Sequence, residues 1–433
     1  MRLAALATAG ALILAACGND SDDGDAATEP PEEEEAAGDE AGSEEEGELR
    51  VWLNGTDTSE EQRQFAIDQF NELHPNVEVV VEEQEWEGLV ERLNAVLPTS
   101  DSPDIVETGT TQTPGFAEAG ALVDLTEFRD RLGGDDLLPA LVESGTSGDS
   151  LFGMPLLAGA RVVTYRTDLF EASGLEVPTT MEEFIEAGRT LQEDNADVPN
   201  FSGIYLPGRN WHAQMALLWD AGGDIAVEED GEWVGQLTSP QSIEAYTTIQ
   251  DIMQNINSAP ADGDDANDFE EFCAGEIGML LGSPGWKQAQ ILDTCPEEME
   301  GKVGAFALPA TGGGIAPAFI GGSHLGISAN SDNVELAVDF LEIIAGEEFQ
   351  VMYAERGVMP ALQSQADSVV GDEGTTAQAE VVPVARSTPA DADWVEVEGQ
   401  EILHDLGTAI GQGNDVETEL ARANDAIEEI LNQ

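Results

Sequence analysis

A tryptophan stands at the end of the stretch FCAGEIGMLLGSPGW, residues 272–286, where it could contact a ligand. The apolar residues from Ile277 to Leu281 predict a short buried strand that breaks at Gly282. The Gly-Ser-Pro-Gly sequence that follows predicts a turn that holds Trp286 at the strand's mouth. A large aromatic residue in this position can face a cleft. The alternative is that Trp286 only fills the core, as large aromatic residues commonly do.

Alternating strand and helix patterns would position such residues. The first part of the chain has strand patterns at residues 49–53, 77–81 and 104–106, with helix patterns at 60–73 and 86–97. This alternation predicts parallel strands in a doubly wound α/β layer, in which ligands bind beyond the carboxyl ends of the strands. The loops expected at those ends are residues 54–57, 84–87 and 108–113.

The same alternation continues to the end of the chain. Thr180 with Glu183 three residues later has the spacing of a capping box and predicts the start of a helix. Further strands are expected at residues 202–206, 303–308 and 324–328. Further helices are expected up to residue 222 and at residues 241–255, 334–345 and 394–431.

The composition limits the partners of the chain. The 433 residues are enough for two domains, and 88 acidic against 15 basic residues give a formal charge of −73. A polyanionic nucleic acid or an anionic membrane surface would be repelled. Such an excess of carboxylates suggests a surface adapted to salty surroundings, where screening limits self-repulsion.

The N-terminus has the pattern of an export signal. Residues 1–17 read MRLAALATAGALILAAC, and the Leu-Ala-Ala-Cys end resembles the bacterial lipobox, in which the cysteine is lipidated. The apolar run is too short to span a membrane, so lipidated Cys17 would anchor the chain. The alternatives are an ordinary secretory peptide or a core helix with a chance cysteine. Residues 18–47 hold 14 acidic and no basic residues, which predicts a disordered, extended linker.

The order of short motifs across residues 48–433 resembles the extracellular solute-binding proteins of bacterial ABC sugar importers, the group that includes maltose-binding protein. The motifs are LRVWLNG (49–55), PDI (103–105), GALVDL (120–125), YRTDLF (165–170), GL with PTT (174–175 and 178–180), FCAGEIGMLLGSPGW (272–286), GGSHLGIS (321–328), LAVDFL (336–341) and GVMP (357–360). Each motif is weak alone, but their order behind a lipobox is a strong signal.

The resemblance implies a two-lobed α/β fold of the periplasmic-binding-protein type (type II), in which each lobe is a sheet flanked by helices. The expected lobes are residues 48–156 plus 310–357 and residues 158–308 plus 360–433, with a hinge between them. It also implies a monomer without cofactors that binds a carbohydrate between the lobes and passes it to the transmembrane subunits of an ABC permease. The protein would lie outside the cytoplasm and contact the cell membrane only through its lipid anchor.

The resemblance also suggests binding residues. Aromatic rings suit the C–H face of a sugar, and polar side chains suit its hydroxyls. Trp286 and Trp394 match family positions that stack on the ligand. Glu398 stands where maltose-binding protein has an arginine, and Thr111 and Gln112 stand where the family has an Asp-Arg pair, so a sugar other than maltose is expected. Residues on the remaining cleft loops are further candidates, with plain loop residues as the alternative: Asn54, Glu85, Trp86, Arg161, Trp211, Gly322 and Ser323.

The sequence GGSHL at residues 321–325 most resembles the corresponding sequence of actinobacterial proteins that bind disaccharides and short oligosaccharides, among them chitobiose binders. An enzyme is not expected, because the four histidines show no metal-binding spacing and no catalytic motif appears, so neither catalytic residues nor a metal site is predicted. A secreted glycoside hydrolase is the alternative, since many acidic residues are available to form a catalytic pair. A third possibility is a surface lipoprotein with a purely structural role.

With Cys17 lipidated, Cys273 and Cys295 are the two remaining cysteines. In an exported protein such a pair is expected to form a disulfide. The alternative is two buried free thiols.

Overall fold

The computed structural model describes residues 47–229, 231–266, 268–366, 369 and 373–433. The expected signal peptide with Cys17 and the acidic linker lie outside the described residues, except that Gly47 already belongs to the first strand. In the part of the chain that the structure describes, no helix combines the length and the apolar character needed to cross a membrane.

The chain begins with the parallel strands that the sequence predicts. β1 pairs in parallel with both β2 and β3, and helix α1 connects β1 to β2. Leu49, Val51 and Leu53 alternate along β1 and are buried. These elements are β1 (Gly47–Asn54), α1 (Glu60–Leu73), β2 (Val77–Gln84), α2 (Leu89–Val96) and β3 (Ile105–Gly109).

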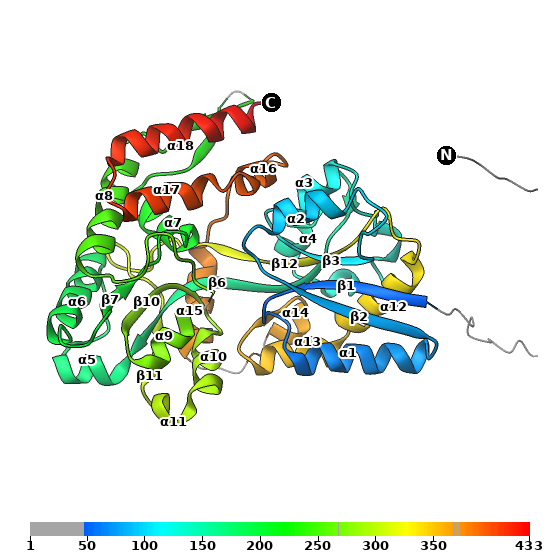
Figure 1. Ribbon diagram of the computed structural model, residues 1–433, viewed down its shortest axis with the longest axis horizontal. Helices are drawn as coiled ribbons and strands as arrows, with labels where there is room; N and C mark the ends of the chain where they lie inside the picture. Colours follow the sequence, from blue (N-terminus) through cyan, green and yellow to red (C-terminus); the bar gives the residue numbers. More distant parts are fainter. Residues whose placement is uncertain (1–46, 230, 267, 367–368, 370–372) are drawn as a thin grey trace, which may run out of the picture. The chain divides into compact units, whose positions relative to one another are not determined.

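One long strand, β6 (Met154–Arg166), joins two groups of strands (Figure 1). Its first half pairs with β12 and β13, and its second half pairs with β10 and β11. The strand order is β2-β1-β3-β12-β6-β10-β7, with β11 and β13 beside β6. The partners are β7 (Ser202–Tyr205), β10 (Ile277–Pro284), β11 (Val303–Phe306), β12 (Ile320–Ile327) and β13 (Met359–Pro360).

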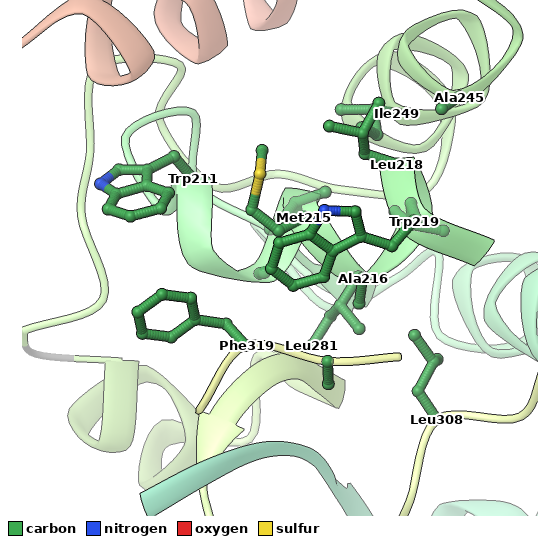
Figure 2. Close-up of a cluster of buried hydrophobic side chains, with 14 of the residues drawn as sticks. Trp211, Met215, Ala216, Leu218, Trp219, Ala245, Ile249, Leu281, Leu308 and Phe319 are labelled. Carbon is green, nitrogen blue, oxygen red and sulfur yellow. The ribbon is translucent and has the colours of Figure 1, made fainter. Parts of the chain in front are cut away.

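Two separate hydrophobic cores lie along β6. The N-terminal core takes its buried residues from 49–157 and 325–358, and the C-terminal core takes them from 160–319 and 377–431. Leu157 belongs to the first core and Ala160 to the second, so the change occurs within three residues of one strand. Figure 2 shows part of the C-terminal core, where side chains from α7 (Trp211–Asp220) pack against Leu281 and Phe319.

Helices cover these strands. Between β3 and β6 they are α3 (Thr113–Glu118), η1 (Thr126–Phe128), η2 (Gly134–Asp136) and α4 (Pro139–Ser144). Between β6 and β12 they are α5 (Thr167–Ser173), α6 (Met181–Asp194), α7, α8 (Pro240–Asn255), α9 (Asp268–Ala274), α10 (Lys287–Thr294) and α11 (Pro296–Met299). After β12 they are α12 (Val334–Ala345), α13 (Glu347–Glu355), α14 (Gln363–Ala366), α15 (Glu373–Val381), η3 (Val382–Val384), α16 (Trp394–Gly399), α17 (Ile402–Gly411) and α18 (Val416–Leu431). Two small hairpins are β4 (Thr146–Ser147) with β5 (Ser150–Leu151) and β8 (Ala226–Glu229) with β9 (Glu232–Gly235).

Several predicted boundaries were wrong. The helix expected from residue 86 begins at Leu89, because Gly88 before it has a φ of 66° that lies outside the helical region. The capping box at Thr180 forms only in half: its hydroxyl accepts from the Glu183 N–H, but the Glu183 carboxylate accepts from Thr179 instead. The helical tail is three helices, α16 to α18.

The predicted strand break at Gly282 is a bulge instead. β10 continues to Pro284, and its register with β6 shifts between Leu281 and Ser283. Gly282 has a φ of 75°, and a Cβ there would lie 2.3 Å from the Cβ of Ala213, so glycine is required. Phe272, at the start of the same stretch, belongs to helix α9.

The predicted disulfide is present. Cys273 in α9 bonds to Cys295 at the end of α10, with an S–S distance of 2.00 Å and a Cα–Cα distance of 6.0 Å. The bond lies beside a small apolar cluster that includes Phe272, Ile277 and Ile291. It therefore ties the helix before β10 to the helix after it.

Candidate functional site

Trp286 lies where the two cores meet. It follows β10 by two residues and occupies the position just before α10. Its ring is half-buried and packs against the N-terminal core, although its backbone follows a strand of the other group. A Cβ on Gly159 of β6 would lie 2.4 Å from the Cζ3 atom of this ring. A glycine on the connecting strand therefore makes room for the indole.

Charged side chains lie close to Trp286, one directly after it in the sequence and one on the neighbouring strand β6. Arg161, which pairs with Pro284 in the sheet, donates from Nη1 to the Asp265 carboxylate and to the Gly282 carbonyl, each at 3.1 Å. Lys287 directly follows Trp286, and its Nζ lies 2.7 Å from Oδ1 of Asp268. Burial raises the pKa of Asp268 to about 6, although Lys287 acts in the opposite direction. The segment around Trp286 is thus fixed by paired charges.

Four predicted residues come together around a single carboxylate, and we call them the Glu398 cluster. Oε1 of Glu398 accepts from the Thr111 hydroxyl at 2.5 Å and from the Trp394 indole N–H at 2.7 Å. Oε2 accepts from the Gln112 side-chain amide at 2.7 Å. Burial raises the pKa of Glu398, and these three hydrogen bonds oppose the shift. The cluster links the start of α3 to α16, and both carboxylate oxygens have partners.

Trp394 has no exposed surface in this structure and belongs to the C-terminal core. Its ring centroid lies 6.4 Å from that of Trp211, which is itself 3% exposed and stacks on His212 at 3.8 Å. In Figure 2 the Trp211 ring lies beside Phe319, at a centroid distance of 5.5 Å. Stacking of either tryptophan on a ligand would require movement of the groups that cover it.

A second polar group, the Glu107 cluster, lies on three neighbouring strands. It consists of Asn54 at the end of β1, Glu107 in the middle of β3 and Ser323 within β12. The Asn54 backbone N–H donates to Oε2 of Glu107 at 2.8 Å, and its side-chain amide donates to the Glu107 carbonyl at 3.2 Å. All three side chains are at most 1% exposed. Among the described residues, Oδ1 of Asn54, Oε1 of Glu107 and Oγ of Ser323 have no hydrogen-bond partner within normal geometry.

The sequence analysis identified Asn54 and Ser323 as candidates and missed Glu107. The available signal was an acidic residue directly after the apolar pair Ile105-Val106, on a strand flanked by two others. Burial raises the pKa of Glu107 to about 8, and the nearby charge of Asp57 adds to the shift. The Ser323 hydroxyl, the Asn54 N–H and Arg63 act in the opposite direction, so Ser323 lies close to this carboxyl although the two make no hydrogen bond of normal geometry. The carboxyl group is therefore mostly protonated at neutral pH.

Asp57 lies in the loop after β1 and accepts a hydrogen bond from the Trp86 indole at 3.0 Å. Burial raises the pKa of Asp57, while this hydrogen bond and the charges of Arg161, Arg356 and Lys287 lower it. The Trp86 ring is 37% exposed. Because Arg161 and Lys287 belong to the other strand group, Asp57 lies within electrostatic reach of both halves of the chain.

The remaining predicted residues have different surroundings. Glu85 is exposed, and its carbonyl accepts from the Arg92 side chain. A Cβ on Gly322 would lie 2.1 Å from the Leu157 carbonyl oxygen, so this position requires glycine for close approach of β12 and β6. The Gly322 carbonyl accepts from the backbone N–H of Thr110 at 3.1 Å.

An ion pair that sequence reasoning missed joins the loops after β2 and β7. Nη2 of Arg209 lies 3.0 Å from Oε1 of Glu87 and 2.9 Å from Oε1 of Glu401. Arg209 is 13% exposed in its side chain, and Glu87 is 56% exposed. Over the described ranges, no group of three or more His, Cys, Asp or Glu side chains is arranged to hold a metal ion. The candidate residues are thus mainly aromatic side chains and polar groups that are uncharged or paired with a neighbour.

The family described as bacterial extracellular solute-binding protein matches residues 55–351. The diacetylchitobiose binding protein DasA of Streptomyces coelicolor is 30% identical over 403 residues, which cover 92% of this chain and 90% of that protein.

Solved structures of solute-binding proteins have the same fold as this chain. A solute-binding protein of an ABC transporter from Thermotoga lettingae, bound to tagatose, superimposes with a TM-score of 0.79 at 20% identity and covers 89% of this chain and all of that one. The GacH receptor of Streptomyces glaucescens, solved without ligand and with acarbose, gives 0.76 at 21% identity over 89% of this chain and 98% of that one. The predicted two-lobed α/β fold is therefore confirmed.

Proposed function

Because the chain belongs to the bacterial extracellular solute-binding protein family, we propose that it captures a disaccharide or short oligosaccharide between its lobes and delivers it to the permease of an ABC importer. The observation that carries this proposal is the half-buried ring of Trp286, seated over Gly159 where the two cores meet. A flat indole at this point can offer its face to the C–H face of a sugar. The polar groups of Asp57, Asn54 and Ser323 would serve its hydroxyls.

The relatives suggest which sugars to test. DasA is a binder of diacetylchitobiose, and the GacH receptor binds acarbose. Maltose is a less favoured ligand, because Thr111, Gln112 and Glu398 satisfy one another and differ from the residues that grip maltose in maltose-binding protein. Diacetylchitobiose is therefore the first sugar in our proposed panel.

The proposal includes the expected organisation of the chain. The lobes would be residues 48–156 plus 310–357 and residues 158–308 plus 360–433, moving about a hinge near residues 154–158, 308–310 and 357–360. Cys17 would carry the lipid anchor outside the cytoplasm, and the protein would act as a monomer. It would bind its sugar without converting it, so incubation with the panel should return every sugar intact, whereas a glycoside hydrolase would cleave it.

Trp286→Ala tests the proposal. We expect this variant to melt close to the unmodified protein and to bind the sugar at least tenfold more weakly, because an apolar platform is lost at the ligand. Calorimetric titration with diacetylchitobiose, maltose and acarbose measures the affinity, and thermal unfolding without sugar measures stability. If Trp286 only fills the core, the same change should instead cost about 3–5 kcal/mol of stability and leave the affinity of the folded protein unchanged.

A further inference from the structure

Among the described residues, three buried polar atoms on the neighbouring strands β1, β3 and β12 lack a hydrogen-bond partner of normal geometry. They are Oδ1 of Asn54, Oε1 of Glu107 and Oγ of Ser323. A buried polar atom without a partner costs about 1–3 kcal/mol, so three such atoms in one place are unusual in a folded protein. Their cost is removed when a ligand or water supplies the missing bonds.

Resting on the proposed function, we infer that Glu107 is a further ligand-binding residue, and that the Glu107 cluster forms a polar floor which binds a neutral, hydroxyl-bearing part of the sugar. The unpaired atoms suit such a ligand, which would reach them by movement of the groups that cover them, because all three side chains are at most 1% exposed. Oε2 of Glu107 is already occupied by the Asn54 backbone N–H at 2.8 Å, which leaves Oε1 free. Asn54 adds a free amide oxygen, and Ser323 adds a hydroxyl that can donate or accept.

The charge state of Glu107 decides what the floor can bind. The carboxyl is neutral at pH 7, since its pKa is raised to about 8 by burial and by Asp57. With Oε2 accepting from Asn54, the proton resides on Oε1, which becomes a donor. One donor, one acceptor and one hydroxyl match sugar hydroxyls, which both donate and accept.

The groups that face Glu107 come from several elements. Asp57 stands on the loop after β1, Arg63 on α1, and Tyr353 and Arg356 on or just after α13. Burial raises the pKa of Tyr353 above its usual value, so its hydroxyl, bonded to Thr58 at 2.7 Å, does not titrate below pH 10. A change in binding near pH 8 would thus come from the pair of Glu107 and Asp57.

Two variants of Glu107 test the inference. Glu107→Gln keeps the size and the donor of a protonated glutamate, whereas Glu107→Leu removes every polar atom. The probe is whichever of diacetylchitobiose, maltose and acarbose raises the Tm of the unmodified protein most. For the unmodified protein we expect constant affinity up to pH 7 and a loss approaching tenfold per pH unit above pH 8, because the sugar needs the protonated form. Glu107→Gln should bind within about threefold at pH 7 and keep that affinity to pH 9.5, whereas Glu107→Leu should bind at least tenfold more weakly.

Asp104→Asn is the matched control. Asp104 is buried three residues before Glu107, but its oxygens accept from Arg50, Ser331 and Asn333. This variant should keep the pH profile of the unmodified protein. Unchanged affinity in Glu107→Leu, or the same fall above pH 8 in Glu107→Gln, would overturn the inference. If Glu107→Leu does not fold, the profile of Glu107→Gln decides.

The remaining outcome is that buried water alone occupies these atoms. Crystal structures with and without the probe would then show the same water at the Glu107 cluster, which would overturn the inference but leave the proposed function intact. Binding of none of the three sugars by the unmodified protein would overturn both.

Discussion

The Glu398 cluster and the Glu107 cluster each place a glutamate among buried polar groups, but only one of them is complete. Both oxygens of Glu398 accept hydrogen bonds, from Thr111, Gln112 and Trp394. Glu107 has one occupied and one free oxygen, and its neighbours Asn54 and Ser323 also carry free atoms. Burial raises the pKa of both carboxyl groups. Glu398 is only half-buried whereas Glu107 is 1% exposed, so the two sites differ in depth as well as in their partners.

This difference separates a structural contact from a binding group. A complete network rigidifies the protein, and removing its centre leaves several donors unpaired. An incomplete network has lost hydrogen bonds to water without replacing them, so a ligand gains by completing it. The Glu398 cluster is therefore a structural contact between α3 and α16, which we call the Glu398 clamp. The Glu107 cluster instead has the properties of a ligand-binding site.

The largest effect is expected at the clamp. Glu398→Ala should lower the free energy of unfolding by about 3 kcal/mol, because the buried donors of Gln112 and Trp394 and the half-buried Thr111 hydroxyl lose their acceptor, and a buried unpaired donor costs about 1–3 kcal/mol. Urea unfolding measures the change. The neighbouring Glu396→Ala is the control, since Glu396 is exposed and its side chain bonds only to that of Gln400, at 2.9 Å. Equal stability of the two variants would contradict the clamp and remove the contrast with Glu107.

The pH dependence of stability gives an effect of similar size when it is summed over several pH units. The folded pKa of Glu107 is about 8, above its ordinary value of 4.5, so between these values the folded protein holds a proton that the unfolded chain releases. Its contribution to stability is fully present below pH 4.5 and is lost as the pH rises to 8, by up to about 1.4 kcal/mol per pH unit. Glu107→Gln removes this loss, so the variant should become progressively more stable than the unmodified protein from pH 5 to pH 8.

Urea unfolding at each pH unit in that range would measure the difference. Contributions of carboxylates remote from Glu107 cancel in it, because both proteins share them. Asp57 responds to the charge of Glu107 and therefore belongs to the measured difference. Asp104→Asn controls for loss of a buried acid that is fully hydrogen-bonded. If the curves of Glu107→Gln and the unmodified protein run parallel, Glu107 is ionised in the folded state and its proposed role as a donor fails.

The sequence predicted the local parts of this architecture well. Helices α1 (Glu60–Leu73) and α12 (Val334–Ala345) begin and end at the predicted residues, because apolar periodicity and terminal signals are local. The break expected at Gly282 became a bulge, since a glycine with positive φ is compatible with either and β6, far away in sequence, decides between them.

The two clusters differ in how far sequence could reveal them. Thr111 and Gln112 lie 287 and 286 positions from Glu398, and only the family resemblance connected them. The sequence did not identify Glu107 as a candidate, because a single acidic residue after two apolar residues is also typical of an exposed strand end. Its burial depends on pairing with Val51 to Asn54 on one side and with β12, more than 200 residues later, on the other. Partners at such distances set the pKa, so local sequence cannot give it.

The smallest effect is expected at the ion pair between the loops after β2 and β7. Glu87→Gln removes one of the two carboxylates that pair with Arg209, and Glu401 remains. Glu87 is 56% exposed, so we expect a loss of less than about 1 kcal/mol at low ionic strength and none in 1 M NaCl, where screening acts within a few ångströms.

Glu401→Gln is the matched variant, because it removes the other partner of Arg209, from the chain segment that packs with the C-terminal core. Thermal unfolding of both variants at the two salt concentrations separates the contact between the loops from the contact within one half. Equal and small losses would mean that the exposed bridge contributes little to holding the loops together. A loss above about 2 kcal/mol for Glu87→Gln alone would instead mean that this bridge stabilises the fold as strongly as the Glu398 clamp is expected to, since only desolvated charges reach that size. In that case a complete set of hydrogen bonds would not be the property that distinguishes a structural contact, such as the Glu398 cluster, from a binding group, such as the Glu107 cluster.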